Sequence, residues 1–166
     1  MILYVLRHGI AEDAAPGRDD RVRRLTPRGR TKLRAAAAGM RALGLEIEAL
    51  LTSPLVRAAE TAAIVAEVYG GKLAPQELPA LASGQAPADT VRALRPFARH
   101  AHVMIVGHEP GLGETIALLL AGSTESFALD LKKGGLVALE LDLAHPQSRA
   151  TLRWMLTPRQ LRRLGR

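Results

Sequence analysis

The sequence contains no cysteine, and aromatic residues make up only 3% of it. The absence of cysteine excludes disulfides, thiolate metal sites, iron–sulfur clusters and any phosphatase or protease that attacks through sulfur. The few aromatic residues are scattered along the chain instead of being interleaved with its basic segments, which argues against a protein that stacks single-stranded bases. Any covalent nucleophile must therefore be a residue other than cysteine.

Long hydrophobic runs are also missing. No apolar run approaches the roughly 18 residues of a membrane span, and the apolar opening at 1–6 is followed at once by Arg7 and His8. A secretory signal would need a positive flank, a longer apolar stretch and a small-residue cleavage site. We therefore expect a cytoplasmic protein with no membrane partner.

Three motifs that identify large enzyme classes are absent. The chain has no G-x-x-x-x-G-K-[ST] phosphate-binding loop, no G-x-G-x-x-G dinucleotide fingerprint and no H-E-x-x-H zinc motif. The length of 166 residues fits one domain, so residues 1–166 are expected to form a single domain. The composition, 48% hydrophobic and 23% charged, is that of a folded globular chain.

Basic charge is concentrated in two segments. The net charge is +7, with eight basic and two acidic residues at 18–34 and six basic residues without an acid at 149–166. Such segments bind nucleic acid, steer anionic substrates or form solvated helix faces. The scarcity of aromatic residues weakens the nucleic-acid interpretation. The sequence leaves the role of both segments open.

Short apolar runs alternate with helical repeats along most of the chain. Strands are predicted at 2–6, 49–52, 73–78, 102–106, 127–131, 136–141 and 151–156, with a hairpin turn at 132–135. Helices are predicted from Pro27 to Leu43, from Leu55 to Tyr69, from Pro87 to about Arg99 and from Pro110 to Gly122. This alternation predicts an α/β fold, a three-layer α/β/α sandwich with a mostly parallel central sheet.

Basic side chains follow three of the predicted strands. Arg7 and His8 follow the first strand, Arg57 the second, and His108 the strand at 102–106. Ligands of such a sheet bind beyond the carboxyl ends of the strands, so these side chains should meet in one crevice. Two imidazoles and two guanidiniums suit a tetrahedral oxyanion such as phosphate. Histidine can also accept a phosphoryl group and lose it to water.

A metal site is a competing interpretation of the same residues. His8 and His108, together with Glu12 or Glu109, are residue types that bind a divalent ion. However, the Arg7 guanidinium directly beside His8 would repel a cation. We therefore predict a site without a metal and an enzyme without a cofactor.

Four motifs resemble, in order and spacing, those of the histidine phosphatase superfamily, also called the phosphoglycerate mutase-like family. They are LRHG at 6–9, LTPRG at 25–29, TSPLVRAAETA at 52–62 and VGHEPGL at 106–112. The short chain, the early R-x-L-T-x-x-G segment and the closing W-x-x-x-P-x-x-L at 154–161 are similar to the SixA-type phosphohistidine phosphatases. The resemblance covers nearly the whole chain and implies a phosphoglycerate mutase-like fold.

The resemblance also implies roles for individual residues. It implies that His8 is the nucleophile and that Arg7, Arg57 and His108 bind the phosphate, the same four residues that the strand ends should bring together. The mutase and small-ester members usually follow RHG with a small hydroxyl residue and an Asn, whereas this chain continues with Ile10. That departure argues against a mutase.

Ester-cleaving members of the family also use a carboxylic acid from the variable region to protonate the leaving alcohol. Between 73 and 91 only Glu77 and Asp89 are available, and neither belongs to a recognisable motif. Glu12, just past the nucleophile, is a further candidate for the acid or for a carboxylate that orients the histidines. A phosphoramidate needs such an acid least, because imidazole accepts a proton with a pKa of roughly 6.5 and departs neutral.

The sequence therefore predicts a metal-independent phosphohistidine phosphatase that acts through a covalent phospho-His8 intermediate. We expect the substrate to be a phosphohistidine-bearing protein of the phosphorelay or phosphotransfer type. One alternative is a broad small-molecule phosphomonoesterase of the same superfamily, with Glu77 or Asp89 as the acid. Another is a noncatalytic anion-binding or nucleic-acid-binding module that uses the basic segments.

Overall fold

A mixed six-stranded sheet forms the centre of the molecule. The computed structural model describes residues 1–143, 145 and 149–165. The strands are β1 (Ile2–Arg7), β2 (Ala49–Thr52), β3 (Gln76–Glu77), β4 (His102–Gly107), β5 (Leu136–Glu140) and β6 (Thr151–Leu156). They lie in the order β3-β2-β4-β1-β5-β6, with the first four parallel and with β5 and β6 added antiparallel at one side.

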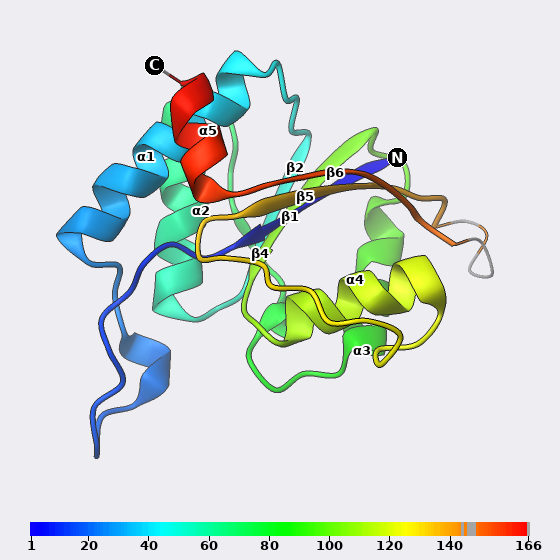
Figure 1. Cartoon of the computed structure of the whole chain (residues 1–166), viewed down its shortest axis with the longest axis horizontal. Helices are drawn as coiled ribbons and strands as arrows, with labels where there is room; N and C mark the ends of the chain where they lie inside the picture. Colours follow the sequence, from blue (N-terminus) through cyan, green and yellow to red (C-terminus); the bar gives the residue numbers. More distant parts are fainter. Residues whose placement is uncertain (144, 146–148, 166) are drawn as a thin grey trace.

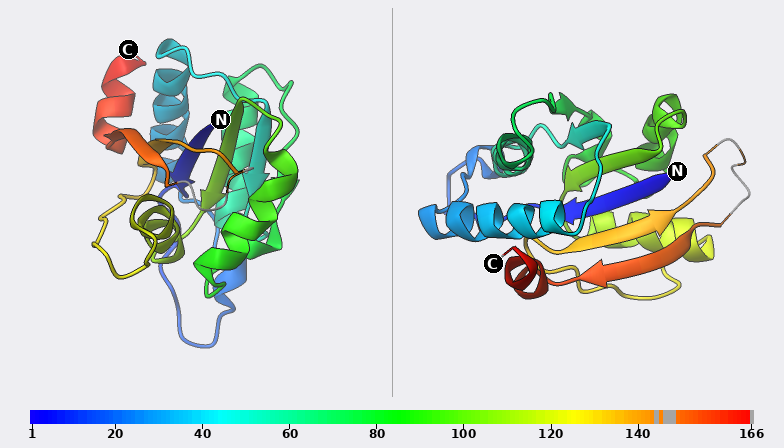
Figure 2. Two further views of the ribbon diagram at one scale, coloured as in Figure 1. Left: turned by 90° about the vertical axis from the view of Figure 1, so that its right-hand side faces the viewer. Right: turned by 90° about the horizontal axis from the view of Figure 1, so that it is seen from above.

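Helices cover both faces of this sheet (Figure 1). The described residues form α1 (Pro27–Ala42), α2 (Val56–Val68), α3 (Pro87–Leu94), α4 (Gly111–Ala121) and α5 (Pro158–Leu164), and the 3-10 helices η1 (Asp20–Val22), η2 (Pro79–Leu81) and η3 (Arg95–Phe97). α1, α2 and α5 pack on one face, and α3 and α4 pack on the other (Figure 2). The predicted three-layer α/β/α sandwich is confirmed. Within the described residues, no helix is long and apolar enough to cross a bilayer.

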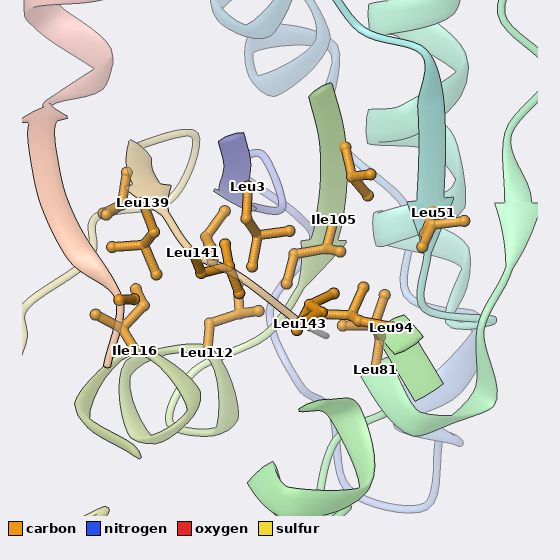
Figure 3. Packing of buried hydrophobic residues seen from close by; sticks show 14 of the residues in the cluster. Leu3, Leu51, Leu81, Leu94, Ile105, Leu112, Ile116, Leu139, Leu141 and Leu143 are labelled. Atoms are coloured by element: carbon orange, nitrogen blue, oxygen red, sulfur yellow. The ribbon is translucent and has the colours of Figure 1, made fainter. Parts of the chain in front are cut away.

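Strand β1 is buried on both faces, as expected for a strand between two layers of helices. Side chains of successive strand residues point to opposite faces. Leu3 and Val5 accordingly belong to the core cluster under α3 and α4, which also contains Ile105 of β4 (Figure 3). Tyr4 and Leu6 belong to the cluster under α1, α2 and α5. The two cores hold the sheet in place from both sides.

The predicted start of the first helix is confirmed. Thr26 caps α1, because its Oγ1 accepts a hydrogen bond from the Gly29 amide at 2.9 Å, and Pro27 occupies the first turn. Leu33, Ala36, Ala37 and Met40 of α1 are buried. Leu43, the predicted last residue of the helix, is 41% exposed, since α1 ends one residue earlier.

The predicted strand at 127–131 is wrong. The turn at 132–135 is present, with the Gly135 amide donating to the Lys132 carbonyl at 2.7 Å, but it joins no hairpin. β5 pairs with β1 on one side and with β6 on the other, so no edge of β5 is left for a third strand. The antiparallel connection runs from β5 to β6 instead. The segment before β5 is fixed to the end of β1, where Gly134 N–H donates to the Arg7 and His8 carbonyls at 3.0 and 3.1 Å.

Two other boundaries differ from the sequence prediction. The third helix ends at Leu94 instead of near Arg99, and the chain continues as η3. Pro96 explains this end, because it has no backbone N–H for the hydrogen bond to residue 92 that would continue the α-helix. The weak strand at 73–78 is reduced to the two residues of β3.

Candidate active site

The carboxyl ends of neighbouring parallel strands bring the predicted basic side chains together. β4 lies beside β1, with Gly107 opposite Arg7. His8 and His108, which follow these strands, therefore lie close together, with ring centroids 5.0 Å apart. Arg57, in the first turn of α2 after β2, completes the group. His8, Arg57 and His108 are only 5%, 3% and 4% exposed, so they form a buried polar cluster.

The His8 imidazole is neutral at neutral pH. Burial lowers its pKa to about 3, against the opposite effect of a hydrogen bond to Gly9, and the positive charges of His108, Arg57 and Arg7 act in the same direction as burial. Nδ1–H donates to the Gly9 carbonyl oxygen at 2.7 Å, since a carbonyl can only accept. This hydrogen bond assigns the proton to Nδ1 and leaves the Nε2 lone pair free.

A buried threonine ties the loop after β1 to helix α2. The Gly9 amide donates to Thr61 Oγ1 at 3.0 Å, and the Thr61 hydroxyl donates to the Arg57 carbonyl at 2.7 Å. Sequence reasoning did not assign Thr61 a role. The signal was present, because residues four apart lie on the same helix face and Thr61 follows Arg57 by four positions.

His108 is oriented by a serine at the end of β2. Its Nε2 lies 2.8 Å from Ser53 Oγ, and the same oxygen accepts the Leu55 amide at 3.2 Å. The Ser53 hydroxyl can donate to Nε2, and in that tautomer the His108 proton is on Nδ1. Burial lowers the pKa of His108 to about 4, so this imidazole is also neutral at neutral pH.

The two arginines are held by different partners. Arg7 Nη1 donates to the Leu131 carbonyl at 2.7 Å. Arg57 donates from Nη1 to the Asp20 carbonyl at 2.8 Å and from Nη2 to the Asp20 carboxylate at 2.9 Å. Asp20 also accepts a hydrogen bond from Arg23 Nε at 2.6 Å. The sequence gives no signal for Asp20, because it lies in the short helix η1, far from Arg57 in the chain, and meets Arg57 only in the folded protein.

Three buried nitrogens at the site have no hydrogen-bond partner among the described residues. They are Arg7 Nε, Arg57 Nε and His108 Nδ1. A buried donor without a partner costs about 1–3 kcal/mol, so native structures rarely leave several close together unless a ligand accepts them. A tetrahedral oxyanion beside His8 would accept hydrogen bonds from donors of this kind. The cluster therefore has the chemistry of an anion-binding site next to a neutral imidazole.

The acids singled out in the sequence form ion pairs elsewhere or are exposed. Glu12 forms an ion pair with Arg18 at 3.2 Å, and Asp89 forms one with Arg92 at 2.8 Å on α3. Glu77 is exposed in β3. No hydrogen bond or ion pair between the described residues links any of the three to either histidine. The described residues also contain no group of three or more His, Asp or Glu side chains that could hold a metal ion.

A different carboxyl group, that of Glu109, adjoins the site. Burial raises its pKa to about 7, and the positive charge of Arg7 opposes this rise. Gly113 supplies a backbone hydrogen bond to the carboxyl group, whereas Glu109 Oε1 is buried without a partner among the described residues. In the sequence, Glu109 was a candidate only as a metal ligand. Its position directly after His108 was the signal for a role at the site.

Comparisons with known proteins agree with this geometry. A family model described as histidine phosphatase superfamily (branch 1) matches residues 3–83. An uncharacterized protein of Picosynechococcus is 38% identical to this chain, with 89% of this chain and 90% of the other covered. The phosphohistidine phosphatase SixA of Escherichia coli is 27% identical, with 98% and 97% covered. The chain belongs to the histidine phosphatase superfamily.

The solved structure of a relative supports the same assignment. The protein histidine phosphatase SixA complexed with tungstate superimposes with a TM-score of 0.82, at 26% identity, over 97% of this chain and 99% of the other. The fold is therefore the phosphoglycerate mutase-like α/β fold predicted from the sequence, and the chain falls in the SixA-type branch of its superfamily. The protein is a phosphatase.

Proposed function

We propose that this phosphatase hydrolyses phosphohistidine on a protein, through a covalent phospho-His8 intermediate and without a metal. The observation that carries the proposal is the set of three unpartnered buried nitrogens, on Arg7, Arg57 and His108, around a neutral imidazole. The tungstate complex of the SixA relative supports it, because tungstate is a tetrahedral oxyanion like phosphate. The phosphohistidine substrate is favoured by the similarity to SixA.

The proposed first step is attack by His8 on phosphorus. The Nε2 lone pair forms an N–P bond, while the P–N bond to the substrate imidazole breaks and its electron pair stays on the departing nitrogen. Arg7, Arg57 and His108 donate hydrogen bonds to the phosphoryl oxygens and stabilise the charge that develops on them. The Gly9 carbonyl holds the Nδ1 proton of His8 and fixes the orientation of the ring throughout.

The second step returns His8 to its starting state. Water attacks the phosphorus of phospho-His8, the N–P bond breaks, and inorganic phosphate leaves with the oxygen of that water.

The imidazole leaving group of the first step departs neutral if its nitrogen is protonated beforehand, and its ordinary pKa of roughly 6.5 makes this easy near neutral pH. Glu12 and Asp89 are held in ion pairs with Arg18 and Arg92, and a phosphoramidate substrate requires neither of them as an acid.

The experiment that tests the proposal measures phosphate release in EDTA from two substrates. One is a protein that carries phosphohistidine and the other is p-nitrophenyl phosphate, each with wild type and with His8→Ala. We expect faster turnover of the phosphohistidine protein, loss of turnover in His8→Ala, and no effect of EDTA. A strict metal requirement, or full activity in His8→Ala, would contradict the proposal. The partner of phosphorelay type and the cytoplasmic location stay predictions.

A small-molecule phosphomonoesterase is the second candidate function, and Glu109 is the observation that favours it. A carboxyl group with its pKa raised to about 7 by burial carries a proton near neutral pH and can protonate a leaving alkoxide. This reading replaces Glu77 or Asp89 by Glu109 as the acid. It predicts faster turnover of p-nitrophenyl phosphate than of phosphohistidine. It also predicts that Glu109→Gln reduces the rate of ester hydrolysis.

A further inference from the structure

A pocket separate from the cluster of His8 and His108 lies beside the loop that follows β1, between α1, α5 and the turn before β5. Its volume is about 360 Å³, within the range of about 300–1,000 Å³ of pockets that bind ligands. Part of its wall is apolar, formed by Ile10, Leu33 and Ala36. Leu33 and Ala36 are almost fully buried, so this part of the wall belongs to the rigid face of α1.

The rest of the wall is basic. The basic residues that line the pocket are Lys32, Lys132, Lys133, Arg159 and Arg162, and no acidic residue lines it. Lys132 is neutralised by an ion pair with Asp130. The other four form no ion pair and no side-chain hydrogen bond with any described residue. They come from both basic segments of the sequence and from the turn before β5, and folding gathers them around one apolar wall.

The pocket is connected to the catalytic loop by backbone contacts. Gly9 and Ile10, the residues after His8, line it directly. Gly134 lines it as well, and its amide donates to the carbonyls of Arg7 and His8. Figure 1 shows α1, α5 and the turn before β5 at the end of the sheet where β1 ends. A molecule that fills the pocket therefore lies at the same end of the protein as the two imidazoles.

We propose that this pocket is the docking site for an acidic surface of the phosphohistidine-bearing protein, with an aliphatic side chain of that protein seated on the apolar wall. The proposal rests on the proposed function, because it names the kind of partner that this function requires. Charge complementarity selects the partner: four unpaired cations without an opposing acid need carboxylates in the complex. The apolar wall gives the partner an anchor, as is typical of the centre of a protein interface.

A protein partner explains features that a small substrate leaves unused. The phosphoryl group and its imidazole occupy the site of His8 and His108, neither of which lines the basic pocket. Docking at the basic pocket would raise the local concentration of the phosphohistidine at His8. Long-range attraction between the cations and the acidic partner would also speed their association. Affinity for the protein would then depend on the pocket, whereas the chemical step would depend on the imidazoles.

The test separates docking from chemistry with two substrates. We would measure kcat and KM on an acidic histidine-phosphorylated phosphotransfer domain and on free phosphohistidine, for Arg159→Glu and for Lys32→Glu/Arg159→Glu. The matched controls are Arg163→Glu, which changes the same charge on the same helix outside the pocket, and Arg163→Glu/Lys72→Glu. Arg159, Arg163 and Lys72 are all exposed, so these replacements should not disturb folding.

We expect each charge reversal in the pocket to raise KM for the phosphorylated domain about tenfold, the size of a lost charge contact. kcat on that domain, both constants on free phosphohistidine, and the two control variants should stay near wild type. Equal KM values for pocket variants and controls would overturn the docking proposal. An equal rise in KM, or a fall in kcat, on free phosphohistidine would also overturn the proposal, because the pocket residues would then affect the catalytic step itself.

Direct binding distinguishes a failure of the docking site from a failure of the function. Calorimetry with the unphosphorylated domain measures docking without turnover. Binding that weakens in Arg159→Glu and not in Arg163→Glu supports the docking site, even if wild type hydrolyses neither phosphohistidine substrate and the proposed function is wrong. Turnover by wild type with equal binding by both variants would instead retain the function and reject the docking site.

Discussion

Burial of a neutral imidazole should make the protein sensitive to acid, and His8 allows the size of this effect to be worked out. Its pKa is about 3 in the folded protein, against roughly 6.5 in an unfolded chain. Between these two values the unfolded chain binds a proton that the folded protein does not bind. Stability therefore falls as the pH falls through this window, since proton uptake favours the unfolded state.

The magnitude follows from the width of the window that is crossed. Each pH unit below the unfolded pKa costs about 1.4 kcal/mol of unfolding free energy per group. Acidification from neutral pH to about pH 5 crosses about 1.5 units, so His8 alone should remove about 2 kcal/mol. That loss is a large part of the total stability of about 5–15 kcal/mol that is typical of a domain.

The assay is urea unfolding at neutral pH and at about pH 5, for wild type and for His8→Ala. The free energy of unfolding of His8→Ala should fall by about 2 kcal/mol less than that of wild type over this interval. The comparison uses only the change with pH, so a cavity left by the substitution does not affect it. His145→Ala is the control, because it removes an imidazole that is 77% exposed.

Glu109 provides a second test of the same reasoning with the opposite sign. Burial raises its pKa to about 7, so the folded protein holds a proton that the unfolded carboxyl group releases. This uptake stabilises the folded state as the pH falls, and Glu109→Gln removes it. The variant should therefore lose more stability than wild type on acidification. Equal pH dependence of wild type, His8→Ala and Glu109→Gln would refute the assigned burial of both groups.

Three further predictions concern the site and its support. Arg7→Ala and Arg57→Ala should each reduce kcat/KM for phosphohistidine by about 10²–10³, which steady-state kinetics would check, and a loss below tenfold would reject their role. Thr61→Val leaves the Gly9 amide without its acceptor and should cost about 1–3 kcal/mol in urea unfolding; unchanged stability would contradict the assigned bond. Gly29→Ala places a Cβ 2.0 Å from the Ile10 carbonyl oxygen and should lower the melting temperature, whereas the uncrowded Gly111→Ala should not.

The local pattern of the sequence predicted most of the secondary structure. The run at 102–106 became the buried strand β4, and Thr26 and Pro27 started α1, because strand burial and helix capping depend on residues close together in the chain. The predicted strand at 127–131 was wrong because strand pairing depends on segments that are distant in the chain. A strand needs a neighbour to pair with, and only the tertiary arrangement shows that β5 pairs with β1 and β6 instead of with the segment before it.

The site divides in the same way. The positions of Arg7, His8, Arg57 and His108 after predicted strands were enough to expect them at one end of a parallel sheet, since the rule follows from strand direction alone. The partner of Arg57, the raised pKa of Glu109 and the basic pocket between α1 and α5 were not predictable. Each depends on side chains from distant segments, and on burial, which only the packed structure determines.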